Sequence, residues 1–167
     1  MPGAARLRRL LAMAAAFIVR PDEGRLLDLG NFQAEVLASS EQTLGEFTLL
    51  KTQNEPPGFG PPLHRHHDAA EAFFVLQGEY LMFFEDKQAL CPAGSFVYIP
   101  CGSPHTFKVT SAEAGKKLNL FTPASMVGFF EELAAAEAAG TATAELLDRI
   151  AERNHMEVLG PVPETYL

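Results

Sequence analysis

The sequence has few basic residues for its length. It contains 13 Lys and Arg against 21 Asp and Glu in 167 residues, for a formal net charge of −8 at pH 7. Proteins that bind nucleic acid neutralise phosphates with a basic patch or stripe, and this composition offers none. We therefore predict no nucleic-acid partner and no binding to an anionic membrane surface. No helix-turn-helix pattern precedes the strand-rich region, which weighs against a transcription regulator.

Cysteine is equally scarce. Cys91 and Cys101 are the only two, too few for a disulfide framework, and the Pro-Ala-Gly turn between them does not favour pairing. A reducing compartment, and hence a cytoplasmic location, is expected.

A long hydrophobic run is also lacking. Residues 1–20 carry arginines followed by an alanine-rich stretch, the outline of a weak signal peptide, but this segment is too short to span a bilayer. The alternative, which we favour, takes Met13 rather than Met1 as the functional start and residues 1–12 as an N-terminal extension. The sequence FIV at residues 17–19 would then be the first strand.

What the chain does have is a series of short β-type runs separated by turn residues. With 47% hydrophobic residues and 13 Phe, one core is expected. The spacing predicts an all-β sandwich or barrel over residues 13–122. The runs cover residues 32–39, 46–52, 71–77, 80–85, 95–100, 105–110 and 117–121.

The pattern changes to helical after Phe121, so residues 123–167 are predicted to form C-terminal helices and a tail. Thr122 and Pro123 suit an N-cap and a first helical position, with a helix running up to Gly140. A second helix is expected over residues 143–153, and the proline-containing tail is expected to be irregular. In the first helix Phe129, Leu133 and Ala136 share a stripe that should pack on the barrel or on a subunit partner.

Three histidines occur within four residues, close to a glutamate. Side chains two apart in a strand share a face, so His64 and His66 point the same way while His67 points the opposite way. Glu71 heads the next strand, and His105 begins a later one. Burying three imidazoles and a carboxylate together is costly without a partner, and a divalent metal is a suitable one.

The larger spacing is more specific than the histidines alone. Gly58-x5-His64-x-His66-x4-Glu71-x6-Gly78 and Gly94-x5-Pro100-x-Gly102-x2-His105 match the two cupin motifs. The chain therefore resembles the cupin superfamily over residues 17–122, and within it the small single-domain, quercetin 2,3-dioxygenase-like proteins. One departure is Val109, where the second motif commonly has Asn, which is not a metal ligand.

The resemblance implies a jelly-roll barrel, a double-stranded β-helix, with one divalent transition metal. Its ligands would be His64, His66, Glu71 and His105, and the metal could be Mn, Fe, Co, Ni, Cu or Zn. His67 is expected to be solvent-facing rather than a ligand. Cys101, four residues before His105, is interpreted as a small packed thiol, although a place near the metal leaves a reactive role open.

A substrate pocket is predicted from strand alternation. If Glu71 and His105 face inward, so should the residues two and four positions further along each strand. Such a wall suits a flat, apolar substrate with one chelating edge. The predicted pocket residues are Phe73, Val75, Phe96, Tyr98, Phe107 and Val109.

The function predicted from these features is a metal-dependent dioxygenase acting on a flavonol-like, catechol-like or diketone small molecule. Glu71 would be both a metal ligand and the base that takes a substrate hydroxyl proton, or a ligand only. Two alternatives stay open, since one barrel hosts many functions: a non-catalytic metal- and ligand-binding protein, and an isomerase or decarboxylase. We also expect a homodimer in which residues 17–19 pair or pack across the interface.

Overall fold

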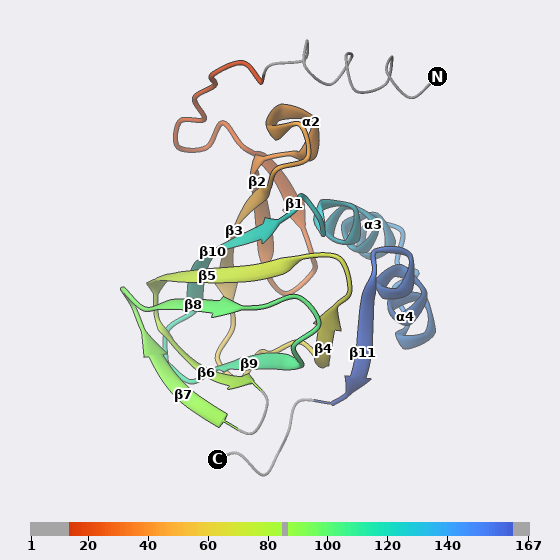
Figure 1. Ribbon diagram of the computed structural model, residues 1–167. Helices are drawn as coiled ribbons and strands as arrows, with labels where there is room; N and C mark the ends of the chain where they lie inside the picture. The colour runs from red at the N-terminus through yellow and green to blue at the C-terminus, as the bar shows by residue number, and fades with distance from the viewer. Residues whose placement is uncertain (1–13, 85–86, 162–167) are drawn as a thin grey trace.

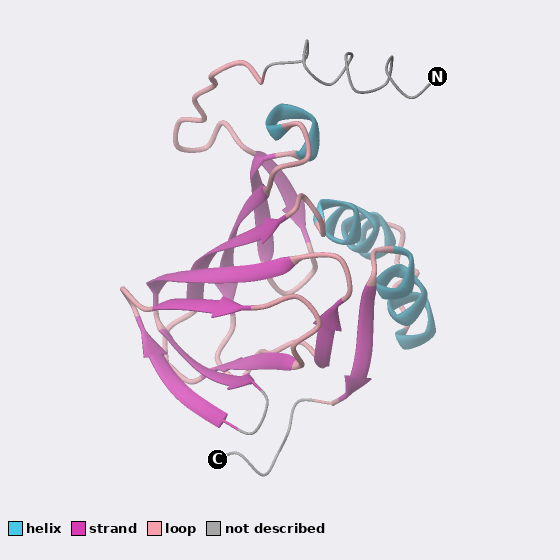
Figure 2. Cartoon of the chain, viewed as in Figure 1, coloured by secondary structure: helices cyan, strands magenta, loops and turns pink. Residues whose placement is uncertain are grey.

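The protein folds into two antiparallel β-sheets with helices along one side (Figures 1 and 2). The computed structural model describes residues 14–84 and 87–161. The six-stranded sheet has, in order, β1 (Arg25–Asp28), β2 (Gln33–Ala38), β3 (Thr48–Glu55), β10 (Gly115–Thr122), β5 (Ala70–Gln77) and β8 (Phe96–Ile99). The five-stranded sheet has β11 (Met156–Gly160), β4 (Leu63–His66), β9 (His105–Val109), β6 (Glu79–Phe84) and β7 (Lys87–Pro92). The all-β prediction is confirmed.

Alternation along the strands gives each sheet an inner and an outer face. In β10 the buried residues are Gly115, Lys117, Asn119 and Phe121, and the residues between them are partly exposed. Successive side chains of a strand point to opposite faces, so every second residue of β10 lies between the sheets. Polar side chains thereby enter the interior together with apolar ones.

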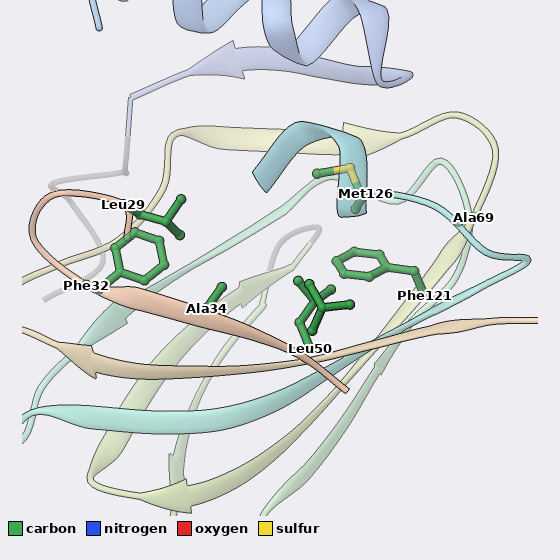
Figure 3. Packing of buried hydrophobic residues seen from close by; sticks show 8 residues of the cluster. Leu29, Phe32, Ala34, Leu50, Ala69, Phe121 and Met126 are labelled. Carbon is green, nitrogen blue, oxygen red and sulfur yellow. The ribbon is translucent and has the colours of Figure 1, made fainter. Parts of the chain in front are cut away.

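Two hydrophobic clusters fill the interior. The first lies where β2, β3 and β10 meet the start of α3 (Val127–Ala138), and Figure 3 shows its members turned toward one another. Its buried residues are Leu29, Phe32, Ala34, Val36, Leu50, Ala69, Phe121 and Met126. The second is built from β5, β6, β7, β8 and β9. Its buried residues are Phe73, Val75, Tyr80, Met82, Cys91, Ile99, Phe107 and Val109.

The helices cover the first cluster. Phe129, Phe130, Leu133 and Ala134 of α3 pack against it, and Ala136 is buried, so the predicted docking of this helix on the barrel is confirmed. The second helix, α4 (Ala144–Arg153), lies within the predicted range of 143–153. Thr143 is its N-cap, and the Thr143 side chain accepts a hydrogen bond from the Leu146 amide at 3.2 Å.

The predicted start of the first helix is wrong. Thr122 is the last residue of β10, paired in register with Ala70, and its hydroxyl donates to the Glu46 carbonyl at 3.0 Å. These contacts hold it in the sheet, and helix α3 begins only at Val127.

Residues 17–19 do not form the predicted first strand. They have no regular secondary structure, and Phe17 and Ile18 are 43% and 78% exposed. The first strand is β1, which pairs with β2. The N-terminal extension at residues 1–12 lies outside the described residues. The homodimer stays a prediction: light scattering should show a dimer at micromolar concentration, and a monomer would refute it.

Three further elements were not expected. β11 lies in the tail that was predicted to be irregular, and it forms because Met156, Glu157 and Val158 pair with β4. β7 pairs with β6. A short helix, α2 (Ser40–Thr43), follows β2 and starts at a capping box formed by Ser39 and Gln42. None of the helices in the described ranges is long and apolar enough to cross a membrane.

Candidate metal centre

The four predicted metal ligands come from three strands on two different sheets. His64 and His66 lie on β4, and His105, at the start of β9, pairs in register with His64. Glu71 lies on β5 of the opposite sheet. Because β4 and β5 are joined by only a few residues, the chain brings the carboxylate across from one sheet to the other. All four side chains are buried.

Their donor atoms converge on one point. One ligand atom from each residue lies within 4.8 Å of the other three. Glu71 Oε2 lies 3.0 Å from His66 Nε2 and 2.9 Å from His105 Nε2. We call His64, His66, Glu71 and His105 the tetrad.

Backbone carbonyls orient two of the imidazoles. His64 Nδ1 lies 2.7 Å from the Pro62 carbonyl oxygen, and His105 Nδ1 lies 2.9 Å from that of Ser103. A neutral ring that donates from Nδ1 is the tautomer with the Nε2 lone pair that a metal ligand requires. An Nε2 of His105 that donates to Glu71 would have to give up its proton to bind a metal. His66 differs, because its buried Nδ1 has no hydrogen-bond partner among the described residues.

Burial and mutual contacts set the protonation of the tetrad. Burial, reinforced by the charge of His105, lowers the pKa of His64 to about 3, so this ring is neutral at pH 7. Burial alone would raise the pKa of Glu71, but hydrogen bonds from His105 and His66 outweigh it and hold that pKa well below its usual range. The pKa of His105 is raised, because its bonds to Glu71 outweigh its own burial. The site therefore contains an ionised carboxylate beside imidazoles.

This donor set fits a divalent transition metal. Imidazole nitrogen and carboxylate oxygen suit Mn, Fe, Co, Ni, Cu and Zn. Glu71 Oε2 lies within 3.0 Å of both His66 Nε2 and His105 Nε2, and the four ligand atoms lie within 4.8 Å of one another, so one ion could contact all of them. A metal site in this position is therefore supported by the chemistry of the residues themselves.

Two neighbouring residues lie outside the tetrad. His67 is half-exposed and its Nε2 lies 2.8 Å from Glu157 Oε2, so the prediction that it faces solvent is confirmed. Cys101 is exposed, with its thiol 3.6 Å from the His66 carbonyl oxygen, so the prediction of a packed thiol is wrong.

A cavity of about 350 Å³ opens from the tetrad. His64, His66 and Glu71 line one part of it. Apolar side chains from the barrel and from α3 form most of the remaining wall, which places a dry environment beside the ionised carboxylate. These apolar residues include Phe32, Phe59, Phe73, Phe107, Phe121, Met126, Phe129 and Leu133.

Comparison with known proteins agrees with the motif spacing and the tetrad geometry. Residues 52–121 match the cupin domain family. This part of the chain is a cupin domain. Over 129 residues the chain is 24% identical to quercetin 2,3-dioxygenase of Bacillus subtilis (strain 168). The matched region covers 77% of this chain but only 38% of that relative. The cupin thus spans well under half the length of the curated relative.

Solved structures support the same fold. KdgF from Halomonas sp. has a TM-score of 0.58 at 15% identity, over 65% of this cupin and 94% of that chain. A predicted oxalate decarboxylase from Thermotoga maritima has a TM-score of 0.59 at 21% identity, over 64% of this cupin and 99% of that chain. The prediction of a cupin jelly roll with C-terminal helices is confirmed.

The predicted pocket residues of this cupin fall into three groups. Phe73 and Phe107 line the cavity. Val75 and Val109 are buried in the second cluster and are not part of the cavity wall. Phe96 and Tyr98, on β8, are exposed.

The inward placement of Phe96 and Tyr98 is wrong, because they are 67% and 60% exposed. Cross-strand partners share a face of the sheet, and the partners of the inward-facing Glu71 and Phe73 on β8 are Ile99 and Val97. A one-residue difference in alternation therefore turns both aromatic side chains outward.

Sequence reasoning also missed polar residues of the cavity wall. Lys117 and Asn119 line it together with Thr52 and Glu55. The signal was present in residues 117–121, because a strand that turns Phe121 inward must turn its second and fourth preceding residues inward as well. No comparable alternation in the sequence indicated that Glu55 faces inward.

Proposed function

We propose that this cupin is a metal-dependent dioxygenase acting on a flavonol-like, catechol-like or diketone small molecule. The observation that carries the proposal is an ionised carboxylate, Glu71, among three imidazoles at the end of a mostly apolar cavity. A flat substrate with one chelating edge matches that combination. The relative named quercetin 2,3-dioxygenase supports the same class of reaction.

The tetrad would hold one divalent transition metal, which when bound supplies Lewis-acid activation of the chelating edge and of dioxygen. Glu71 would take the proton of a substrate enol or phenol, because it is the one carboxylate of the tetrad and it lines the cavity in which the substrate would bind. Phe73 and Phe107 form part of an apolar wall against which a planar substrate would lie. Both oxygen atoms of dioxygen enter the product of a dioxygenation, so no external reductant is required.

Elemental analysis combined with oxygen uptake tests the proposal. The protein is purified without an imidazole-column tag, its metal content is measured, and oxygen consumption is followed with a panel of flavonols, catechols and diketones. We expect close to one metal per chain and oxygen consumption with at least one class. His67→Ala is the matched control, because it removes a neighbouring imidazole that lies outside the tetrad.

Full metal loading without oxygen consumption on the whole panel would overturn the dioxygenase. Tight ligand binding under those conditions would then identify a non-catalytic metal- and ligand-binding cupin. Substrate conversion without oxygen would identify an isomerase or a decarboxylase. A protein that retains no metal after such purification would overturn the metal site itself.

A further inference from the structure

A second group of buried polar side chains lies in the same cavity. Lys117 Nζ lies 2.5 Å from Glu55 Oε1 and 3.1 Å from Thr52 Oγ1. Tyr80 donates its hydroxyl to the other carboxylate oxygen of Glu55, and Asn119 Nδ2 donates to Thr52 Oγ1 at 3.1 Å. We call Thr52, Glu55, Tyr80, Lys117 and Asn119 the Lys117 array. All of its members except Tyr80 line the cavity.

Burying the charged groups of the Lys117 array costs free energy that an apolar core would not. Lys117 and Glu55 are 2% and 1% exposed. A buried ion pair loses the hydration of both charges, and apolar residues of similar volume often stabilise a fold equally well or better. Burial lowers the pKa of Lys117, while Glu55 and then Glu71 act in the opposite direction. Stability alone therefore gives no reason for an ammonium at this position, whereas a ligand in the cavity does.

The ammonium also has binding capacity beyond its partners in the array. It carries three N–H donors, and Glu55 and Thr52 accept two of them. Its nitrogen lies 4.2 Å from the ring centroid of Phe107 and 5.5 Å from that of Phe73, the two aromatic cavity walls. A charged donor beside apolar walls forms stronger hydrogen bonds than the same donor in water. An oxygen atom of a ligand that lies in the cavity against these rings would meet it.

The array and the tetrad lie on neighbouring strands at different levels. In β10, Phe121 pairs with Glu71, while Lys117 pairs with Val75 of the same neighbouring strand. Four residues of strand correspond to about 13 Å between the two backbone levels, and the long lysine side chain can shorten that span. A single planar molecule of two or three rings can therefore reach both centres.

We propose that the Lys117 array is a second substrate subsite, in which the Lys117 ammonium binds an ionisable hydroxyl remote from the chelating edge of the ligand. The ligand class is then a flat aryl enol carrying a further phenolic hydroxyl, with apolar rings between its two oxygen-bearing ends. The proposal rests on the proposed function only for the placement of the chelating edge at the tetrad.

Three probes distinguish the contributions of the two ends of the ligand to its binding. Binding of 3-hydroxyflavone, 3,7-dihydroxyflavone and 3,4′-dihydroxyflavone to the metal-loaded protein is measured by fluorescence. The first probe has the chelating edge alone, and the others add a remote hydroxyl in two positions. We expect at least one dihydroxy probe to bind about tenfold more tightly than 3-hydroxyflavone, as a charge-assisted hydrogen bond allows.

The Lys117→Met/Glu55→Gln double variant should abolish that preference. It removes both charges together, so neither is left buried without its partner. The ratio of the affinity for the dihydroxy probe to that for 3-hydroxyflavone should fall to about one. The affinity for 3-hydroxyflavone itself should stay within about twofold of the wild-type value, a change well below the effect of one such hydrogen bond. Metal content should be unchanged. Lys116→Met is the matched control, because it removes the adjacent ammonium, which does not line the cavity, and it should keep the wild-type preference.

A preference that survives in the double variant would overturn the subsite. So would a wild-type protein with no preference for either dihydroxy probe, a measurement that does not depend on the variant folding. Oxygen uptake is read separately. If the wild-type protein shows normal oxygen uptake but no preference for a dihydroxy probe, the subsite is removed and the dioxygenase stays. If it shows a clear preference but no oxygen uptake, the dioxygenase is removed and the subsite stays.

Discussion

The tetrad and the Lys117 array are both buried polar groups in one cavity, and they differ in how completely they are satisfied. In the array every charge has an opposite charge, with Lys117 against Glu55. In the tetrad three imidazoles share one carboxylate, and His66 Nδ1 has no partner in the described part of the chain. The array is nearly complete as it is, whereas the tetrad needs a cation to be complete. The two centres should therefore respond differently when one member is removed.

The largest expected effect is loss of metal from the tetrad. His64→Ala or His105→Ala should each remove most of the bound metal, because each deletes one of four converging donors. Metal content by elemental analysis is the measurement. His67→Ala should stay close to wild type, since that side chain contacts Glu157 instead. Equal metal loss in all three variants would refute the assignment of ligands.

Removing one charge from the Lys117 array should instead lower the free energy of unfolding. Lys117→Met alone leaves Glu55 buried without its counter-charge, which is expected to cost about 3–5 kcal/mol in the free energy of unfolding. The Lys117→Met/Glu55→Gln double variant should recover most of that loss. Urea unfolding of both variants measures the difference. Equal destabilisation by the single and double variants would show that the pair is not the controlling interaction.

Activity and metal content should separate at Glu71. Glu71→Gln should retain much of the metal, because the amide oxygen can still coordinate weakly. Oxygen-dependent turnover should fall by about two orders of magnitude, as is typical when a positioned base is lost. Metal content and the rate of oxygen uptake are measured on the same preparation. If both fall in proportion, Glu71 is a ligand only.

The smallest expected effect is a pH dependence of the metal-free protein. The pKa of His64 is lowered to about 3 in the folded state, against about 6.5 when unfolded. Between these values only the unfolded chain binds this proton, so stability should fall as the pH drops from about 6.5 toward 3. The contribution is at most about 1.4 kcal/mol per pH unit. His105, whose pKa is raised, acts in the opposite sense.

Urea unfolding at a series of pH values measures that slope. His64→Asn should flatten the slope between pH 3 and 6.5, because it removes the group that only the unfolded chain protonates there. An unchanged slope in His64→Asn would show that another group is responsible.

Sequence reasoning succeeded where the chemistry was encoded in local spacing. The alternation of His64 and His66, with His67 on the other face, follows from strand geometry alone. Thr143 at the start of α4 was predicted correctly because an N-cap acts within one turn. Predictions that depended on partner strands did less well. Residues 17–19 have the composition of a strand but pair with no strand among the described residues of the chain, whereas residues 156–160 gain their strand from β4.

The sequence by itself determined that this is a β-rich cupin with three histidines and a glutamate positioned for a metal, because motif spacing and alternation are properties of the local chain. Only the tertiary structure decided which aromatic side chains face the cavity and which polar ones accompany them. Phe96 and Tyr98 face outward since β8 takes its register from β5. Lys117 meets Glu55 from 62 residues away, a contact fixed by the pairing of β10 with β3. Register between strands distant in sequence depends on how whole faces are buried, and no local pattern specifies it.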